Sequence, residues 1–229
     1  CNDGGGACAP IMQAALAIAA GIANVVVVYR AMNERSLVRF GAGPSHANQQ
    51  VPSYLNANHF SWYLPAGLST PAAFVALSAS AYMHKYRATT EDFGRIAVAA
   101  REFAASNPAA FFYGKPLTLD DHQKSRFIAE PLRLFDCCQE SDGAVAMVVT
   151  SLERARALTR TPVVIRAAAQ GCAGDQRLTG FYEGDMCTLP GLGVVSRQLY
   201  AQSGLSPREM DCAILYDHFT PLVLMQLEE

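Results

Sequence analysis

The feature that most limits how this chain can fold is an apolar segment, residues 212–215, that runs directly into polar side chains. The polar residues are Tyr216, Asp217 and His218, and the apolar Phe219 follows them. Because a buried strand bonds its neighbours only through its backbone, polar side chains gathered at its carboxyl end face a crevice. We therefore predict a buried strand with a functional site at its tip. The simpler interpretation, in which these residues only begin a surface loop, stays open at this point.

The composition indicates a globular chain with a large core. Of its 229 residues, 51% are hydrophobic and 17% are charged, which suits one large or two modest domains. The net charge is −2 and the lysines and arginines are scattered, so no basic stripe marks a nucleic-acid partner. The apolar stretch 14–28 is too short to span a bilayer, and no membrane span is expected.

The cysteines point to a reducing compartment. The chain has seven, an odd number, and two of them are adjacent, Cys137 and Cys138. This arrangement is typical of reduced thiols, so we predict a cytoplasmic protein. No Cys/His spacing fits a metal site, and no structural metal is expected.

Hydrophobic period and turn signals predict alternating helices and strands. The long stretch 41–71 has neither a helical nor an alternating hydrophobic period, which predicts a functional or interface-forming loop. Its aromatic residues are Tyr54, Phe60, Trp62 and Tyr63. Thr161-Pro162 is the predicted boundary between a first part, 1–160, and a second, 161–229. The predicted helices are 11–20, 70–87, 90–106, 119–127, 152–158 and 193–203, and the predicted strands are 25–29, 144–149, 163–169 and 212–216.

Four stretches together resemble the thiolase superfamily, in particular its sterol-carrier or lipid-transfer-protein type and the steroid side-chain-degrading aldolases within it. The resemblance implies an α/β thiolase fold of two similar βαβαβαββ halves with central buried helices. This chain would be an incomplete segment: 1–160 most of the first half, with a loop insertion at about 41–130, and 161–229 the start of the second. The four stretches are Gln13 to Ser36, Tyr82 to Pro108, Ala129 to Ala144, and Tyr216-Asp217-His218-Phe219.

Two departures from the family pattern bear on the chemistry. The position of the family's nucleophilic cysteine falls at about Gly4, and the nearby Cys1 and Cys8 are each displaced by about one helical turn. Tyr216 stands where relatives have Asn or His, and a phenol can both donate and accept a proton.

The resemblance therefore favours a retro-aldol cleavage of a β-hydroxyacyl-CoA, such as a steroid side-chain thioester, without an acyl-enzyme. Tyr216, Asp217 and His218 are the candidate catalytic residues, and His84 is the candidate substrate-binding residue. No cofactor is expected because CoA is part of the substrate. The resemblance also implies a homodimeric core joined by a small OB-fold and zinc-ribbon partner that helps to bind acyl-CoA. Two alternatives remain: a thiolase with a displaced cysteine, and a non-catalytic lipid-transfer or scaffold subunit.

Overall fold

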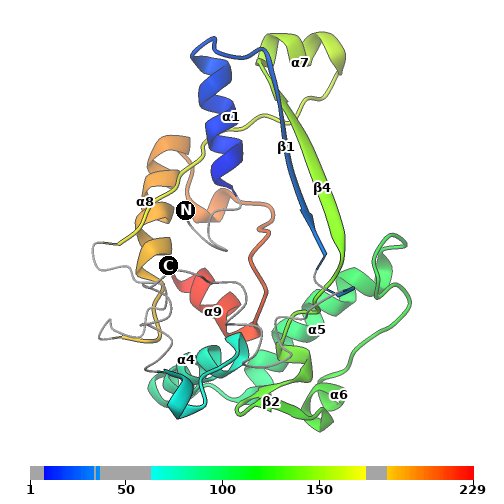
Figure 1. Cartoon of the computed structure of the whole chain (residues 1–229), viewed down its shortest axis with the longest axis vertical. Helices are drawn as coiled ribbons and strands as arrows, with labels where there is room; N and C mark the ends of the chain where they lie inside the picture. The colour runs from blue at the N-terminus through cyan, green and yellow to red at the C-terminus, as the bar shows by residue number, and fades with distance from the viewer. Residues whose placement is uncertain (1–7, 34, 37–62, 174–184) are drawn as a thin grey trace.

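The computed structural model describes residues 8–33, 35–36, 63–173 and 185–229, and its narrow upper part is built on a two-stranded sheet (Figure 1). Strand β1 (Val25–Met32) pairs antiparallel with β4 (Gly143–Thr150) along its whole length. Both strands are rich in β-branched residues, which suit a pleated surface. Helix α1 (Ala9–Ala19) packs on this sheet, and α7 (Leu152–Leu158) directly follows β4. The predicted strands 25–29 and 144–149 and the predicted helices 11–20 and 152–158 are thus confirmed.

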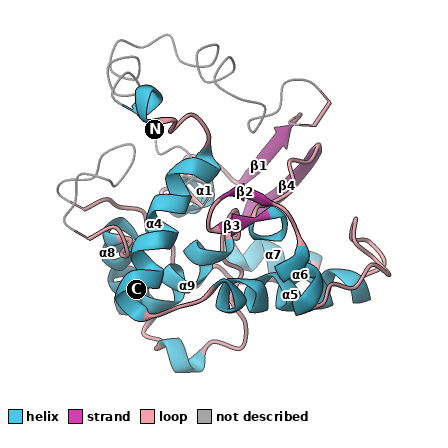
Figure 2. Ribbon diagram, turned by 90° about the horizontal axis from the view of Figure 1, so that it is seen from below, coloured by secondary structure: helices cyan, strands magenta, loops and turns pink. Residues whose placement is uncertain are grey.

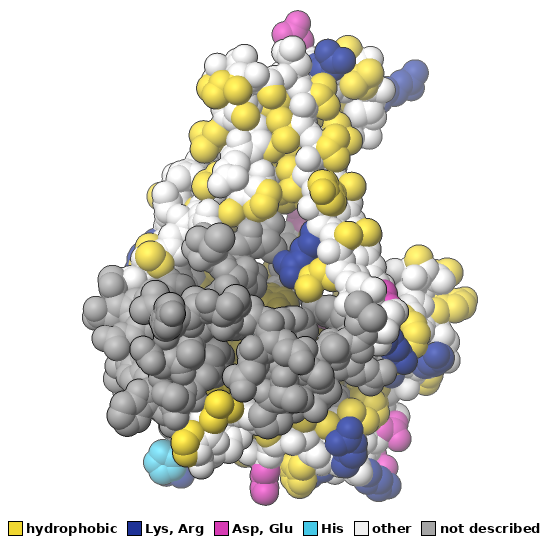
Figure 3. Space-filling model, in the orientation of Figure 1, with side chains coloured by type: hydrophobic (Ala, Val, Ile, Leu, Met, Phe, Trp, Pro, Cys, Tyr) yellow, Lys and Arg dark blue, Asp and Glu magenta, His cyan; other side chains and the backbone are white. Residues whose placement is uncertain are grey.

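Much apolar surface of this upper part is exposed. Ala14 is the one buried residue of α1, and Leu16 on the same helix is 60% exposed. Figure 3 shows hydrophobic side chains across this part of the visible face. A central helix is expected to be covered on two sides. Within the described residues, α1 is covered on one side, by the sheet of β1 and β4.

The lower, wider part holds the main core (Figures 1 and 2). Helices α4 (Pro71–Tyr86) and α5 (Thr90–Ser106) pack against the carboxyl-terminal helix α9 (Thr220–Glu228), beside a small hairpin of β2 (Phe127–Ala129) and β3 (Leu132–Arg133). Small alanines on α4 let its neighbours approach closely. The buried core residues are Ala72, Ala76, Ala79, Tyr82, Phe93, Leu132, Cys187, Phe219 and Met225.

Local capping explains where these helices begin and end. Thr70 caps α4, with its side chain accepting a hydrogen bond from the Ala73 amide, and Pro71 occupies the first turn. Thr89 and Asp92 form a capping box at the start of α5, and the hydrogen bonds from Thr89 hold the Asp92 pKa below its usual range. Helix α8 (Pro190–Ser203) ends at Gly204, whose left-handed backbone suits glycine.

Three sequence predictions differ from the structure. The helix expected over 119–127 is shorter: α6 (Leu119–Lys124) ends before Phe127, which pairs with Arg133 in the β2–β3 hairpin. Residues 163–169 and 212–216 form no strand, because neither segment has a ladder partner within the described residues. Ile214 is fully exposed, so the predicted burial of residues 212–216 is wrong; Val163 is 99% exposed.

Some predictions fall outside the described residues. These are the nucleophile position near Gly4, Cys1, and the loop aromatics Tyr54, Phe60 and Trp62. Tyr63 is described and packs edge-on against Phe74, with ring centroids 5.3 Å apart. The boundary at residues 161–162 remains a prediction. In the part of the chain that the structure describes, no helix is both long and apolar enough to cross a membrane.

Candidate active site

Tyr216 and His218 stack directly before the start of α9. Their ring centroids lie 3.9 Å apart, and the ring planes differ by 15°. Tyr216 is 58% exposed, His218 is half-buried, and Asp217 between them is exposed. The fold thus brings the rings of two of the three predicted catalytic residues face to face at the surface, although no strand presents them.

One ring nitrogen of His218 has a fixed role. Nδ1 lies 3.2 Å from the backbone carbonyl oxygen of Tyr216. Because a carbonyl oxygen only accepts, Nδ1 carries the hydrogen of this bond, and Nε2 keeps its lone pair in the neutral ring. Burial lowers the pKa of His218, outweighing the Tyr216 carbonyl and Asp217, which act in the opposite direction. The imidazole is therefore uncharged near pH 7, with Nε2 available as a proton acceptor.

The backbone of Tyr216 is held by one side chain of α9. The Tyr216 amide donates to Gln226 Oε1 at 3.1 Å, and Gln226 Nε2 donates to the Tyr216 carbonyl at 2.8 Å. Gln226 thus satisfies both polar groups that a neighbouring strand would otherwise pair. Sequence reasoning missed Gln226, which lies ten residues away in an otherwise apolar helix and gives no motif.

The next residues are anchored in the core. The Cys138 amide donates to the His218 carbonyl at 2.9 Å, and Cys137 forms an isolated antiparallel bridge with Phe219. Phe219 is 7% exposed and belongs to the main core. The tip, residues 216–218, is therefore exposed on its outer side and fixed to the body of the protein by the residues that follow it.

The thiol of Cys137, which lies beside the tip, is unsuited to nucleophilic attack. Burial, and then the neighbouring Asp136 carboxylate, raise the pKa of Cys137 to about 12. A thiol with this pKa is almost entirely protonated at pH 7, and the thiolate is the nucleophilic form. Cys8 is exposed at the start of α1.

His84, the candidate substrate-binding residue, lies apart from the other candidates. It is exposed in the last turn of α4. Within the described residues, no hydrogen bond or ring contact joins it to Tyr216, Asp217 or His218. Its role in binding stays a prediction.

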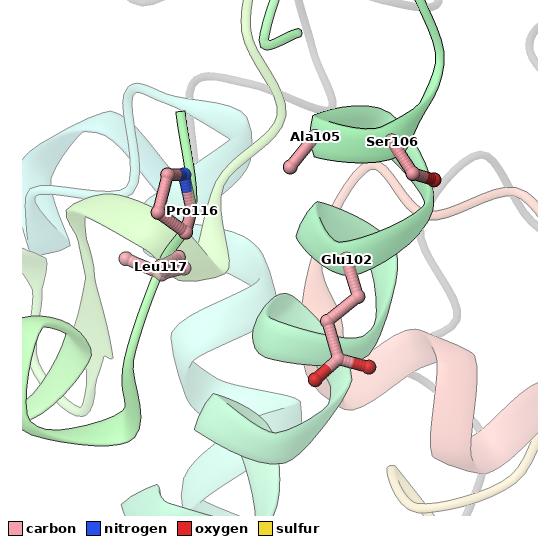
Figure 4. Close-up of a pocket in the computed structure, with 5 residues that line it drawn as sticks. All are labelled: Glu102, Ala105, Ser106, Pro116 and Leu117. Atoms are coloured by element: carbon pink, nitrogen blue, oxygen red, sulfur yellow. The ribbon is translucent and has the colours of Figure 1, made fainter. Parts of the chain in front are cut away.

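Among the described residues, neither a metal-binding cluster nor the pocket at the end of α5 marks another site. The described residues include no group of three His, Cys, Asp or Glu side chains placed to hold a metal ion. A pocket of about 370 Å³ lies between the end of α5 and the segment before α6 (Figure 4). It includes none of the candidate catalytic residues; its lining is Glu102, Ala105, Ser106, Pro116 and Leu117.

Comparison with known proteins places this geometry in a family. No family model matches the chain. It is 57% identical over 227 residues to the 17-hydroxy-3-oxo-4-pregnene-20-carboxyl-CoA lyase of Mycobacterium tuberculosis, a match that covers 99% of this chain and 58% of the relative. The solved structure of an Ltp2-ChsH2(DUF35) aldolase superposes with a TM-score of 0.90 at 54% identity, over 98% of this chain and 56% of that one.

A more distantly related solved structure has a similar fold. A monomeric SCP2-thiolase-like protein from Mycobacterium smegmatis matches with a TM-score of 0.71 at 17% identity, over 97% of this chain and 45% of that chain. By its sequence matches, the chain belongs to the thiolase superfamily, in its sterol-carrier-protein type. This thiolase-like chain spans 58% of the length of the curated relative that it matches. The family and fold expected from the sequence are confirmed.

Proposed function

We propose that this protein cleaves a carbon–carbon bond in a β-hydroxyacyl-CoA by a retro-aldol reaction. Its substrate would be a steroid side-chain thioester with a tertiary hydroxyl at the β-carbon. The proposal is supported by the 57% identity to a steroid-CoA lyase and by the stacked Tyr216 and His218, which offer proton-transfer groups without a thiol. CoA is part of the substrate, and no cofactor is needed.

The reaction requires a base, an acid and donors for the thioester oxygen. A base removes the proton of the β-hydroxyl, the bond between the α- and β-carbons breaks, and its electron pair moves into the thioester as an enolate. The β-carbon leaves as a ketone. Protonation of the enolate at the α-carbon gives the shorter acyl-CoA, so no covalent enzyme intermediate and no free CoA take part.

Tyr216 is the group that we assign to proton transfer at the hydroxyl. A phenol has an ordinary pKa of ~10, so it needs a neighbour able to share its proton near neutral pH. His218 is held uncharged by burial, and its stacked ring fixes the direction of Tyr216. Asp217, exposed between them, contributes negative charge beside the imidazole.

The proposed assembly is a homodimeric core that works in the cytoplasm with a small OB-fold and zinc-ribbon protein. The solved structure that this chain resembles is an Ltp2-ChsH2(DUF35) aldolase, which supports a hetero-oligomer. The partner would contribute to the acyl-CoA site.

The deciding experiment incubates the purified protein with a steroid-ring β-hydroxyacyl-CoA that has a tertiary hydroxyl, with and without added CoA. Products are separated by liquid chromatography and identified by mass. We expect a ketone and a shorter acyl-CoA in equal amounts, at the same rate in both samples.

The two other outcomes correspond to the two alternatives. Product that forms only with added CoA would show a thiolysis by a displaced cysteine. Binding of the thioester without any turnover, in the presence of the small partner, would indicate a lipid-transfer or scaffold subunit.

A further inference from the structure

A fully buried carboxylate lies behind the candidate catalytic residues. Asp136 is 1% exposed, at the end of a 3-10 helix (Leu134–Asp136). Its Oδ2 accepts from the Arg133 amide at 2.7 Å, and its Oδ1 accepts from Thr220 Oγ1 at 2.6 Å. A buried carboxylate with such bonds sets the direction as well as the distance of its partners.

The same Oδ1 is bonded to a buried histidine. His122 is 0% exposed, and its Nε2 lies 2.8 Å from Asp136 Oδ1. On the other side of the ring, Gln123 Nε2 lies 3.3 Å from His122 Nδ1, while Gln123 Oε1 accepts from Thr90 Oγ1 at 3.0 Å. With Nδ1 accepting and Nε2 donating, one hydrogen-bond chain joins α5, α6, the 3-10 helix and α9.

We propose that Asp136, through the Thr220 hydroxyl, positions Tyr216 and His218 for proton transfer. The proposal rests on the retro-aldol function proposed above, and it concerns positioning residues that do not touch the substrate. Thr220 is the first residue of α9 and follows His218 by two residues. A displacement of Thr220 is therefore passed directly to the stacked rings.

Three consecutive contacts form this clamp. Asp136 holds Thr220 through side chains, Cys137 pairs with Phe219, and Cys138 donates from its backbone to the His218 carbonyl. The two segments run antiparallel over these contacts. Of the three contacts, the bond between Asp136 and Thr220 is the one that also belongs to the buried hydrogen-bond network.

Proton transfer requires accurate positioning of the two reacting groups. A reacting pair is productive only over a narrow range of distance and angle, and a displacement of about 1 Å can cost roughly 10²-fold in rate. Tyr216 is 58% exposed and its backbone is held by Gln226, while the clamp holds His218 and the two residues that follow it. A buried pair kept only for stability would not need to reach α9 at the residue beside the tip.

The test uses Thr220, because truncating His122 or Asp136 would leave a buried polar partner unpaired and endanger folding. Thr220→Val removes the hydroxyl and keeps the shape, and Thr220→Ser keeps the hydroxyl. Thr150→Val is the matched control: its hydroxyl donates to the Asn24 carbonyl at 2.8 Å, at the end of β4 next to α7 (Figure 1).

Two readouts are measured on all four proteins. The first is kcat and KM for the β-hydroxyacyl-CoA. The second needs no substrate: the pKa of His218, followed by NMR of the protein with labelled histidine. Burial, the Tyr216 carbonyl and Asp217 act on this ring in the native protein, so its pKa reports whether the ring keeps its place.

We expect Thr220→Val to lower kcat by about 10- to 100-fold with KM within about twofold. Its His218 pKa should move up toward the ordinary value of about 6.5 as the ring loses its burial. Thr220→Ser and Thr150→Val should match the native protein in both readouts. This pattern would establish the clamp.

Other patterns separate the two proposals. An active native protein whose Thr220→Val variant has unchanged kcat and His218 pKa would overturn the clamp and leave the retro-aldol function standing. An inactive native protein in which Thr220→Val alone shifts the His218 pKa would overturn the function and leave the clamp. Equal loss of kcat in Thr150→Val would reduce the effect to general destabilisation and also overturn the clamp.

Discussion

The side-chain amide of Gln226 bonds both backbone groups of Tyr216, accepting from its amide at 3.1 Å and donating to its carbonyl at 2.8 Å. A glutamine on α9 thereby takes the place of a neighbouring strand for one residue. This explains how Tyr216 keeps a defined backbone although residues 212–216 have no ladder partner among the described residues. Because Gln226 holds the backbone of Tyr216, the phenol can be changed without removing these two hydrogen bonds.

Replacing Tyr216 by Phe should slow turnover by roughly 10²–10⁴-fold, the usual loss for a positioned acid or base. The ring and its stacking on His218 are kept, so the free energy of unfolding should change by no more than about 1 kcal/mol. Steady-state rates and a chemical denaturation curve check both numbers. Near-normal turnover in a stable variant would remove Tyr216 from the mechanism.

The pH dependence of stability should carry a contribution from His218. Burial lowers its pKa in the folded protein below the value in the unfolded chain. The unfolded state therefore binds the proton first, and stability falls as the pH drops from about 6.5 through the folded pKa; above about 6.5 the contribution vanishes.

His218→Gln is the variant that isolates this contribution. We expect the native protein to lose more stability than the variant between pH 7.5 and pH 5, as measured by denaturant unfolding at each pH. Identical losses in the two proteins would mean that the folded pKa of His218 is not lowered.

The sequence predicted most of the elements, and its errors share one cause. The cap at Thr70, the capping segment Thr90 to Phe93 and the stop at Gly204 are local signals, and they located α4, α5 and α8 within a few residues. A strand needs a neighbour, and Ile214 has none within the described residues, so its apolar period alone was misleading. For the same reason Phe127, expected in a helix, is found in a hairpin with Arg133.

Some residues of the candidate site were indicated by the sequence, and others join the site only through the fold. Tyr216 and His218 are two residues apart in the sequence, and their residue types alone suggested chemistry. Asp136 and Gln226 belong to the site only because the fold brings distant segments together, and His122 gave no signal in a polar stretch. Tertiary hydrogen bonds of this kind leave no spacing that a sequence pattern could show.

Gly94 should resist replacement by Ala even though it lies inside α5. A methyl group there would lie 2.7 Å from Leu119 Cδ1 and 2.8 Å from His122 Nδ1. Leu119 can turn away, but the His122 ring is held at both nitrogens. Alanine favours a helix by about 1 kcal/mol, whereas forced overpacking costs about 1–3 kcal/mol, so a net loss of stability is expected.

Gly143 supplies the matched control for this substitution. It starts β4, and a methyl group added there meets nothing within 4 Å. Gly143→Ala should change the free energy of unfolding by about 0.5 kcal/mol or less. If Gly94→Ala is equally neutral in a denaturation experiment, the packing of α5 on His122 is looser than described.

Thiol chemistry should be dispensable for turnover. A retro-aldol step needs a base, an acid and donors for the enolate, whereas a thiolysis needs a thiolate at the start of α1. Cys8 is exposed there and its side chain makes no capping hydrogen bond, so its replacement should not disturb the helix. With Cys1 and Cys8 both changed to Ala, we expect turnover of the β-hydroxyacyl-CoA within a few-fold of the native rate, measured without added CoA. A folded double variant that lost two or more orders of magnitude would instead place a nucleophilic cysteine in the reaction and favour the thiolase alternative.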